Sequence, residues 1–150
     1  MKKIDLKWTS LSVVICLVGL ILSGASGNTE THTVERLLRK RVDIMENTLS
    51  GKITFKEGKE QLSEIEEGKL LNDDVKGMMA FMNSDYDKII DMDVLSIEKT
   101  NEVSDVAVFD GEIQWTYQGM EEIYMENNKY YISVKPDDNK LKLVSFELKE

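Results

Sequence analysis

The side chains able to carry nucleophilic, acid–base or metal chemistry are few in this sequence. His32 is the single histidine, and it follows a run of small polar residues that offers no framework to fix catalytic geometry. Cys16 is the single cysteine, and it lies inside an apolar run. Because these two residues supply neither a nucleophile–base pair nor a zinc site, we expect no catalytic residues, no metal, no cofactor and no enzymatic activity.

Acidic residues are the most numerous reactive groups, and four of them lie close together: Asp85, Asp87, Asp91 and Asp93. A calcium-binding EF-hand loop that started at Asn83 would require glycine at its sixth position and glutamate at its twelfth, but Lys88 and Val94 stand there. We therefore interpret these acids as the solvated end of a helix rather than as a metal site.

Aromatic side chains are concentrated in the last third of the chain, where they provide a candidate pocket. If the strands there form a cone-shaped sheet, tyrosine hydroxyls inside the cone can orient a ligand. Packing in the hydrophobic core is the alternative explanation for the same residues. The candidate pocket residues are Trp115, Tyr117, Tyr130 and Ile132.

The charge of the chain is acidic and unevenly distributed. The formal net charge is −9, and the part after the N-terminal apolar run holds 16 basic and 27 acidic residues, a net charge of −11. Such a field repels the phosphate backbone of nucleic acids, which we exclude as partners. One basic cluster stands apart, and we expect it either to contact anionic lipid at the membrane surface or to form a solvated helix face. Its members are Arg36, Arg39, Lys40 and Arg41.

Lysines precede the apolar segment at the N-terminus, an order shared by signal peptides and N-terminal membrane anchors. We expect residues 8–25 to contact membrane lipid as an uncleaved single-pass anchor, with the N-terminus cytoplasmic and the rest of the chain outside. Cleavage after Ala25, followed by secretion, is the alternative, because small residues precede that position. A lipid anchor on Cys16 is disfavoured, since that residue lies within the apolar run.

The apolar segment divides the chain into three predicted parts. Residues 1–25 are the transmembrane anchor or signal peptide, residues 26–32 a polar linker, and residues 33–150 one extracytoplasmic domain. A domain of about 120 residues is large enough for one hydrophobic core but not for two.

Apolar residues at three- and four-residue spacing predict three helices after the linker. The first covers residues 34–49. The second starts with a capping box formed by Thr54 and Glu57, and the third follows a cap at Asn72 or Asp73. The apolar stripe assigned to the third helix comprises Val75, Met78, Met79, Met82, Tyr86, Ile89 and Ile90.

After Asp93 the pattern changes to alternation of apolar and polar residues, which is typical of half-buried strands. We predict four long antiparallel strands built on residues 94–99, 112–118, 130–135 and 140–148, with a turn at residues 136–139. Turns at Asp110-Gly111 and at Asn127-Asn128 would instead give up to six short strands.

The predicted fold class is α+β, with an N-terminal membrane helix followed by three helices packed on a curled antiparallel sheet of about four strands. This order of elements resembles the NTF2-like or cystatin-like superfamily, in which a helical layer closes a bent sheet into a cone. Small bacterial domains exported behind one N-terminal apolar segment are similar to it. The resemblance covers residues 33–150. The layout is also similar to that of VirB8-like components of conjugation machines.

These observations predict a membrane-anchored, non-enzymatic domain that acts by binding or assembly, with envelope proteins as partners. The NTF2-like resemblance implies an alternative, a small-molecule-binding or weakly enzymatic cone. The VirB8-like resemblance implies another, a component of a conjugation machine.

Overall fold

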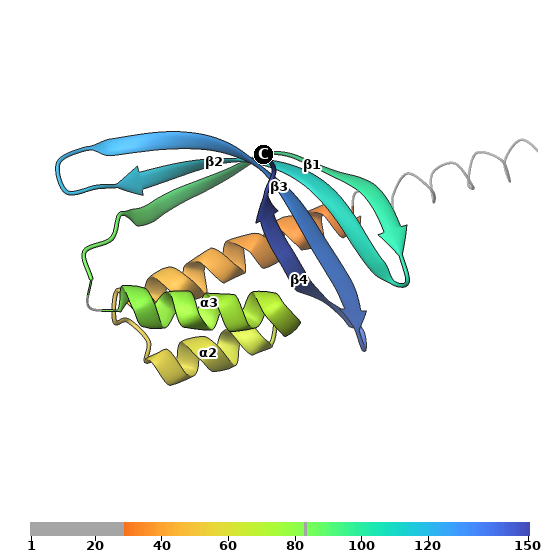
Figure 1. The fold of residues 1–150 in the computed structure, drawn as a ribbon, viewed down its shortest axis with the longest axis horizontal. Coiled ribbons are helices and arrows are strands. Elements are labelled where there is room, and N and C mark those ends of the chain that lie inside the picture. The colour runs from red at the N-terminus through yellow and green to blue at the C-terminus, as the bar shows by residue number, and fades with distance from the viewer. Residues whose placement is uncertain (1–28, 83) are drawn as a thin grey trace, which may run out of the picture.

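The computed structural model describes residues 29–82 and 84–150, which form three helices followed by a four-stranded antiparallel sheet (Figure 1). This arrangement confirms the α+β part of the predicted fold class. The predicted membrane helix and the cleavage position at Ala25 lie outside the described residues. No helix in the described part of the chain is long and apolar enough to cross a membrane.

The first helix includes residues 29–49, so residues 29–32 of the predicted linker are helical, and that part of the prediction is wrong. The segment shows no apolar periodicity because its contacts with the sheet are polar, as in the ion pair of Glu30 with Lys99. Further along, an apolar stripe turns into the core, and Gly51 closes the helix with a positive φ of 72°. The buried apolar residues of the stripe are Val34, Leu37, Leu38 and Ile44.

Helix α2 (Phe55–Ser63) starts at the predicted capping box, in which Thr54 accepts from the Glu57 amide and the Glu57 carboxylate accepts from the Thr54 amide. The helix packs closely against the first helix at Gly58. A Cβ atom at this glycine would lie 2.1 Å from Thr48 Oγ1, so no larger residue fits without a shift.

Helix α3 (Gly68–Phe81) begins earlier and ends earlier than predicted. Its N-cap is Glu67 rather than Asn72 or Asp73, and Met82 leaves the helical region with ψ of 124°. Ile89 and Ile90 lie in the first strand, so their place in the helical stripe was wrong. Their spacing continued the helical period by coincidence, because apolar pairs suit both a helix and a twisted strand.

The strands β1 (Lys88–Val103), β2 (Val106–Gln118), β3 (Ile123–Asp137) and β4 (Lys140–Leu148) form a meander in the order β1-β2-β3-β4. Four long strands were predicted correctly, and the alternative of six short strands is wrong. Asp110-Gly111 and Asn127-Asn128 lie inside β2 and β3, where strand pairing continues through them.

Turn geometry explains where the hairpins form. Ser104 and Asp105 both have positive φ, 50° and 67°, which is the geometry of a two-residue hairpin turn whose twist matches the strands it joins. Asp138, in the turn predicted at residues 136–139, has a φ of 53°. Polar residues that tolerate this conformation stand at both turns.

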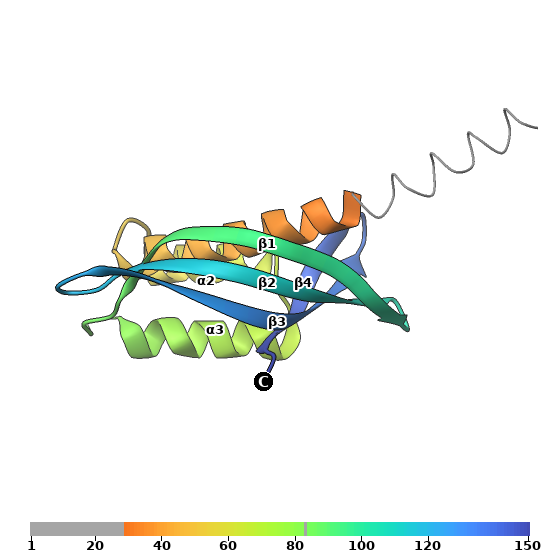
Figure 2. The same ribbon diagram turned by 90° about the horizontal axis from the view of Figure 1, so that it is seen from above.

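The sheet curls over the helical layer, with the first helix beside β1 and α3 beside β4 (Figures 1 and 2). Its inner face packs on the helices, while its outer face is largely polar, as expected for an antiparallel sheet with one solvated side. The buried core residues contributed by the strands are Met92, Phe109, Ile113, Trp115, Ile132, Val134 and Leu143.

The edge of β1 is covered by side chains of the first helix. Arg39 Nη1 donates to the Met92 carbonyl at 2.6 Å, and the Ile89 amide donates to Glu46 Oε1 at 3.1 Å. These bonds satisfy backbone groups that would otherwise be open to pairing with another strand. The helix is thereby fixed against the sheet, and the space between them is defined.

Candidate functional site

An open cavity of about 410 Å³ lies between the first helix, the last turn of α3 and the inner face of the sheet; we call it the aromatic groove. Three of the candidate pocket residues, Trp115, Tyr117 and Tyr130, line it. Ile132 does not, because it is fully buried at 0 % exposure beneath the neighbouring strand. A Cβ atom at Gly111 would lie only 2.6 Å from the Ile132 side chain, so that region is filled by core packing.

Aromatic rings in fixed mutual contact form one wall of the groove. Tyr130 stacks on Phe146 with ring centroids 4.2 Å apart, and Trp115 meets both rings edge-on. Trp115 Nε1 donates to the Tyr130 hydroxyl at 2.9 Å. Because each ring is held by the others, this wall is preorganised and offers a broad apolar surface.

Arg41, which lines the groove, belongs to a buried charged cluster whose other members are Asp74 and Glu66. Arg41 donates to both carboxylate oxygens of Asp74, at 2.6 and 2.7 Å, and its Nε lies 3.1 Å from Glu66 Oε1. Its guanidinium carbon lies 4.9 Å from the centroid of the Phe146 ring. Arg41 therefore points into the fold, and its predicted role in membrane-surface contact is wrong.

Glu66 is the most unusual member of the cluster, since its side chain is 0 % exposed. Burial, followed by the charge of Asp74, raises the pKa of Glu66 to about 8, although Arg41 acts in the opposite direction. Glu66 is therefore mostly protonated at neutral pH. The cluster then holds one cation, one anion and one neutral acid, which limits the cost of burying it.

Carboxylates and tyrosine hydroxyls form the polar side of the groove. Burial is the main cause that raises the pKa of Glu46, and it also raises the pKa of Tyr86 and Tyr117. Tyr124 donates to Asp87 Oδ2 at 2.6 Å, and this hydrogen bond is the main cause that raises the pKa of Tyr124 to about 12. The groove thus presents neutral hydroxyls together with two acidic groups, Glu46 and Asp87.

Exposed apolar side chains surround the end of the molecule where the groove opens. Phe81, which lines the groove, is 52 % exposed, and Met120, in the turn between β2 and β3, is 89 % exposed. The β2–β3 hairpin extends past the end of α3 at this side of the molecule (Figure 1). Other exposed apolar residues of these elements and of β1 include Met79, Met82, Ile90, Ile123 and Met125.

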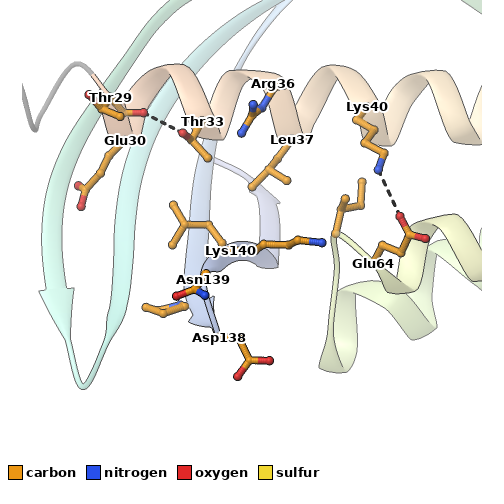
Figure 3. Close-up of a pocket in the computed structure, with 13 residues that line it drawn as sticks. Thr29, Glu30, Thr33, Arg36, Leu37, Lys40, Glu64, Asp138, Asn139 and Lys140 are labelled. Carbon is orange, nitrogen blue, oxygen red and sulfur yellow. Dashed lines mark hydrogen bonds and ion pairs between the residues drawn. The ribbon is translucent and has the colours of Figure 1, made fainter.

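A second, larger cavity of about 770 Å³ lies at the opposite end of the first helix, next to the β3–β4 hairpin; we call it the basic cavity (Figure 3). Two members of the predicted basic cluster, Arg36 and Lys40, line it, and Lys140 joins them from β4. Arg39 lies elsewhere and binds Glu35 and the Met92 carbonyl. The predicted cluster of four therefore divides into two cavity residues, one edge-strand contact and one buried charge.

The predicted acidic group does not form a helix end. Asp91 and Asp93 lie in β1, while Asp85 and Asp87 precede it. Among residues 29–82 and 84–150, no three His, Cys, Asp or Glu side chains are arranged to hold a metal ion. His32 is an exposed residue of the first helix.

Sequence reasoning missed the roles of Arg41, Asp74, Phe81 and Lys140. A signal for the first two was present, because Arg41 interrupts the apolar stripe of the first helix and Asp74 stands between Leu70 and Met78 on α3. Opposite charges at core positions of two helices indicate a buried pair. Phe81 and Lys140 carried no comparable signal, since their positions depend on how the sheet curls.

No family model matches the chain, and no curated protein sequence matches it. Among solved structures, the fold is similar to the intermembrane space region of the chloroplast protein ARC6. The TM-score is 0.52 and the sequence identity 12%, over 78% of this chain and 94% of that one. At this identity the likeness shows a shared α+β fold.

Proposed function

We propose that this chain is a membrane-anchored, non-enzymatic binding domain outside the cytoplasm, and that its aromatic groove holds a segment of an envelope protein. The observation that carries the proposal is the groove, a cavity of about 410 Å³ with a preorganised aromatic wall and exposed apolar residues at its end of the molecule. Exposed apolar surface beside a groove is typical of sites where another chain binds.

The chemistry of the lining favours binding over catalysis. The described residues of the groove include no serine, threonine, cysteine or histidine, the residues from which hydrolytic nucleophile–base pairs are usually built. The structural likeness to a region between two membranes supports a place outside the cytoplasm, as does the order of basic and apolar residues at the N-terminus.

Charge complementarity indicates what kind of segment fits. Glu46 and Asp87 lie on the groove wall, and the one cation in its described lining, Arg41, is already paired with Asp74. A positive charge that entered beside Glu46 would offset the burial that raises the pKa of that carboxyl. The occupant we propose is therefore an apolar side chain with a lysine or arginine next to it in the partner sequence.

Crosslinking and capture of the full chain from the membranes of cells that produce it test the proposal. Tyr117→Lys places a cation in the groove, whereas Gln114→Lys places the same charge on the outer face of the same strand. We expect both the wild type and the Gln114→Lys variant to capture a common protein, and Tyr117→Lys to lose it with unchanged circular dichroism. Equal capture by both variants, or no captured protein from any, would contradict the proposal.

A second candidate function is small-molecule binding, which the hydroxyls of Tyr117 and Tyr130 at the groove favour. In that case a ligand would remain bound in the groove when the protein is purified from its native membrane. Mass spectrometry of such a preparation distinguishes the two functions, because a co-purified small molecule that is lost in Tyr117→Lys would favour the NTF2-like cone.

A further inference from the structure

The basic cavity contains two cations that no described acid contacts directly, although Lys140 acts electrostatically on Asp137. Arg36 and Lys140 form no ion pair or hydrogen bond with any residue that the structure describes. Two acids of the lining are already occupied, since Glu30 binds Lys99 at 2.9 Å and Glu64 binds Lys40 at 3.5 Å. The cations facing the cavity therefore exceed the acids still free to pair with them.

Asp138 is the remaining acid of the lining, and its carboxylate is not directed toward Arg36 or Lys140. Figure 3 shows its carboxylate directed away from the first helix, while Arg36 points from that helix toward the cavity and Lys140 extends across it. Arg36 and Lys140 thus face one space from two elements, the first helix and the start of β4.

The position of the cavity relates it to the membrane. Thr29 and Glu30, the first residues that the structure describes, lie in its wall. Three residues separate Thr29 from the end of the predicted anchor at residue 25, and a fully extended chain spans about 3.3 to 3.6 Å per residue. If the anchor is retained, Thr29 in the cavity wall lies within about 15 Å of the anchor's end, which brings this side of the cavity near the depth where lipid headgroups meet water.

We propose that the basic cavity binds a phosphate group between Arg36 and Lys140. The guanidinium of arginine and the ammonium of lysine are the side chains that recognise phosphate, the first through a fork of two donors and the second as a point charge. A membrane lipid headgroup and a soluble phosphate ester share this chemistry. A lipid as the source of the phosphate requires the membrane anchor of the proposed function. The phosphate site does not require that anchor.

The test uses the full chain in detergent micelles, with Cys16→Ser and a fluorescent label on Asn139→Cys beside the cavity. One series adds phosphatidylglycerol to the micelles, a second adds phosphatidylcholine, and a third adds soluble glycerol phosphate. Arg36→Gln combined with Lys140→Gln removes the site. Lys76→Gln combined with Lys129→Gln, both exposed and outside the lining of the cavity, removes the same charge elsewhere.

We expect phosphatidylglycerol to change the fluorescence at lower concentration than phosphatidylcholine. The cavity variant should weaken this response about tenfold, and the control variant less than twofold. A response to glycerol phosphate with the same dependence on Arg36 and Lys140 would support the phosphate site and assign a soluble source. An equal loss of response in the cavity variant and in the control variant would overturn the proposal. The absence of a fluorescence response to both phosphatidylglycerol and glycerol phosphate would overturn it as well. These results do not affect the capture of a partner through the aromatic groove, so each proposal can be refuted without refuting the other.

Discussion

Replacement of Glu66 by glutamine should remove a strong pH dependence from the stability of the domain. The ordinary pKa of this carboxyl is 4.5, and burial beside Asp74 raises it to about 8 in the folded protein. The folded state therefore keeps a proton that the unfolded state loses between these values. Stability supported by this proton is complete below about pH 4.5, declines as the pH rises, and is lost above about pH 8.

The magnitude follows from the size of the shift. Each pKa unit corresponds to about 1.4 kcal/mol, so between pH 5 and pH 8 the wild type should lose on the order of 3 kcal/mol of unfolding free energy that Glu66→Gln keeps. Glutamine has the same shape and stays neutral. The exposed Glu64→Gln, in the same connection between α2 and α3, should follow the wild type.

Chemical denaturation of the full chain in detergent, followed by tryptophan fluorescence at pH 5, 6, 7, 8 and 9, measures this difference. Trp115 is buried in the core and reports its loss. Carboxyls whose pKa is lowered, such as Asp73 and Asp137, are present in both proteins and cancel in the comparison. Parallel curves for the wild type and Glu66→Gln would show that Glu66 ionises normally and would refute the description of the buried cluster.

Three further predictions concern the helical layer. Arg41→Met should cost about 3 to 5 kcal/mol of unfolding free energy, because it leaves Asp74 buried without its partner. In thermal denaturation, a double variant that also carries Asp74→Leu should regain part of the lost stability. Gly58→Ala should destabilise the domain by about 1 to 3 kcal/mol in a urea titration, although alanine has the better helix propensity. Adding Thr48→Ala to this variant should relieve the loss, because it removes the side chain that the new Cβ atom would meet. A stabilised Gly58→Ala would contradict the close contact. Thr54→Ala should cost about 1 kcal/mol by the same titration, and an unchanged midpoint would show that the capping box contributes nothing.

Local patterns explain which parts of the fold were predictable from sequence. The capping box at Thr54 and Glu57 and the alternation along β2 depend on neighbouring residues, and both were identified correctly. The end of α3 was not, because Ile89 and Ile90 extend the helical spacing although Ile89 pairs with Tyr117 in the sheet. In that segment, pairing with β2 in the sheet overrides the helical spacing of the apolar residues.

The candidate site shows the same division. Trp115, Tyr117 and Tyr130 were found because alternate residues of a strand share a face, and two adjacent strands bring them together. The same rule placed Ile132 with them, but the curl of the sheet buries it under Gly111. The role of Arg41 was missed, since composition shows a basic cluster without showing which member points inward.

Site-specific photo-crosslinking in intact cells tests the central claim most directly. A benzophenone amino acid at position 81 would stand at the aromatic groove, and the same group at position 131 would stand on the outer face of β3, where Tyr131 is also exposed. The proposed function predicts a specific crosslinked protein from position 81, absent from position 131 and lost when Tyr117→Lys is added. Equal crosslinks from both positions, or crosslinks from position 131 alone, would contradict a partner-binding groove.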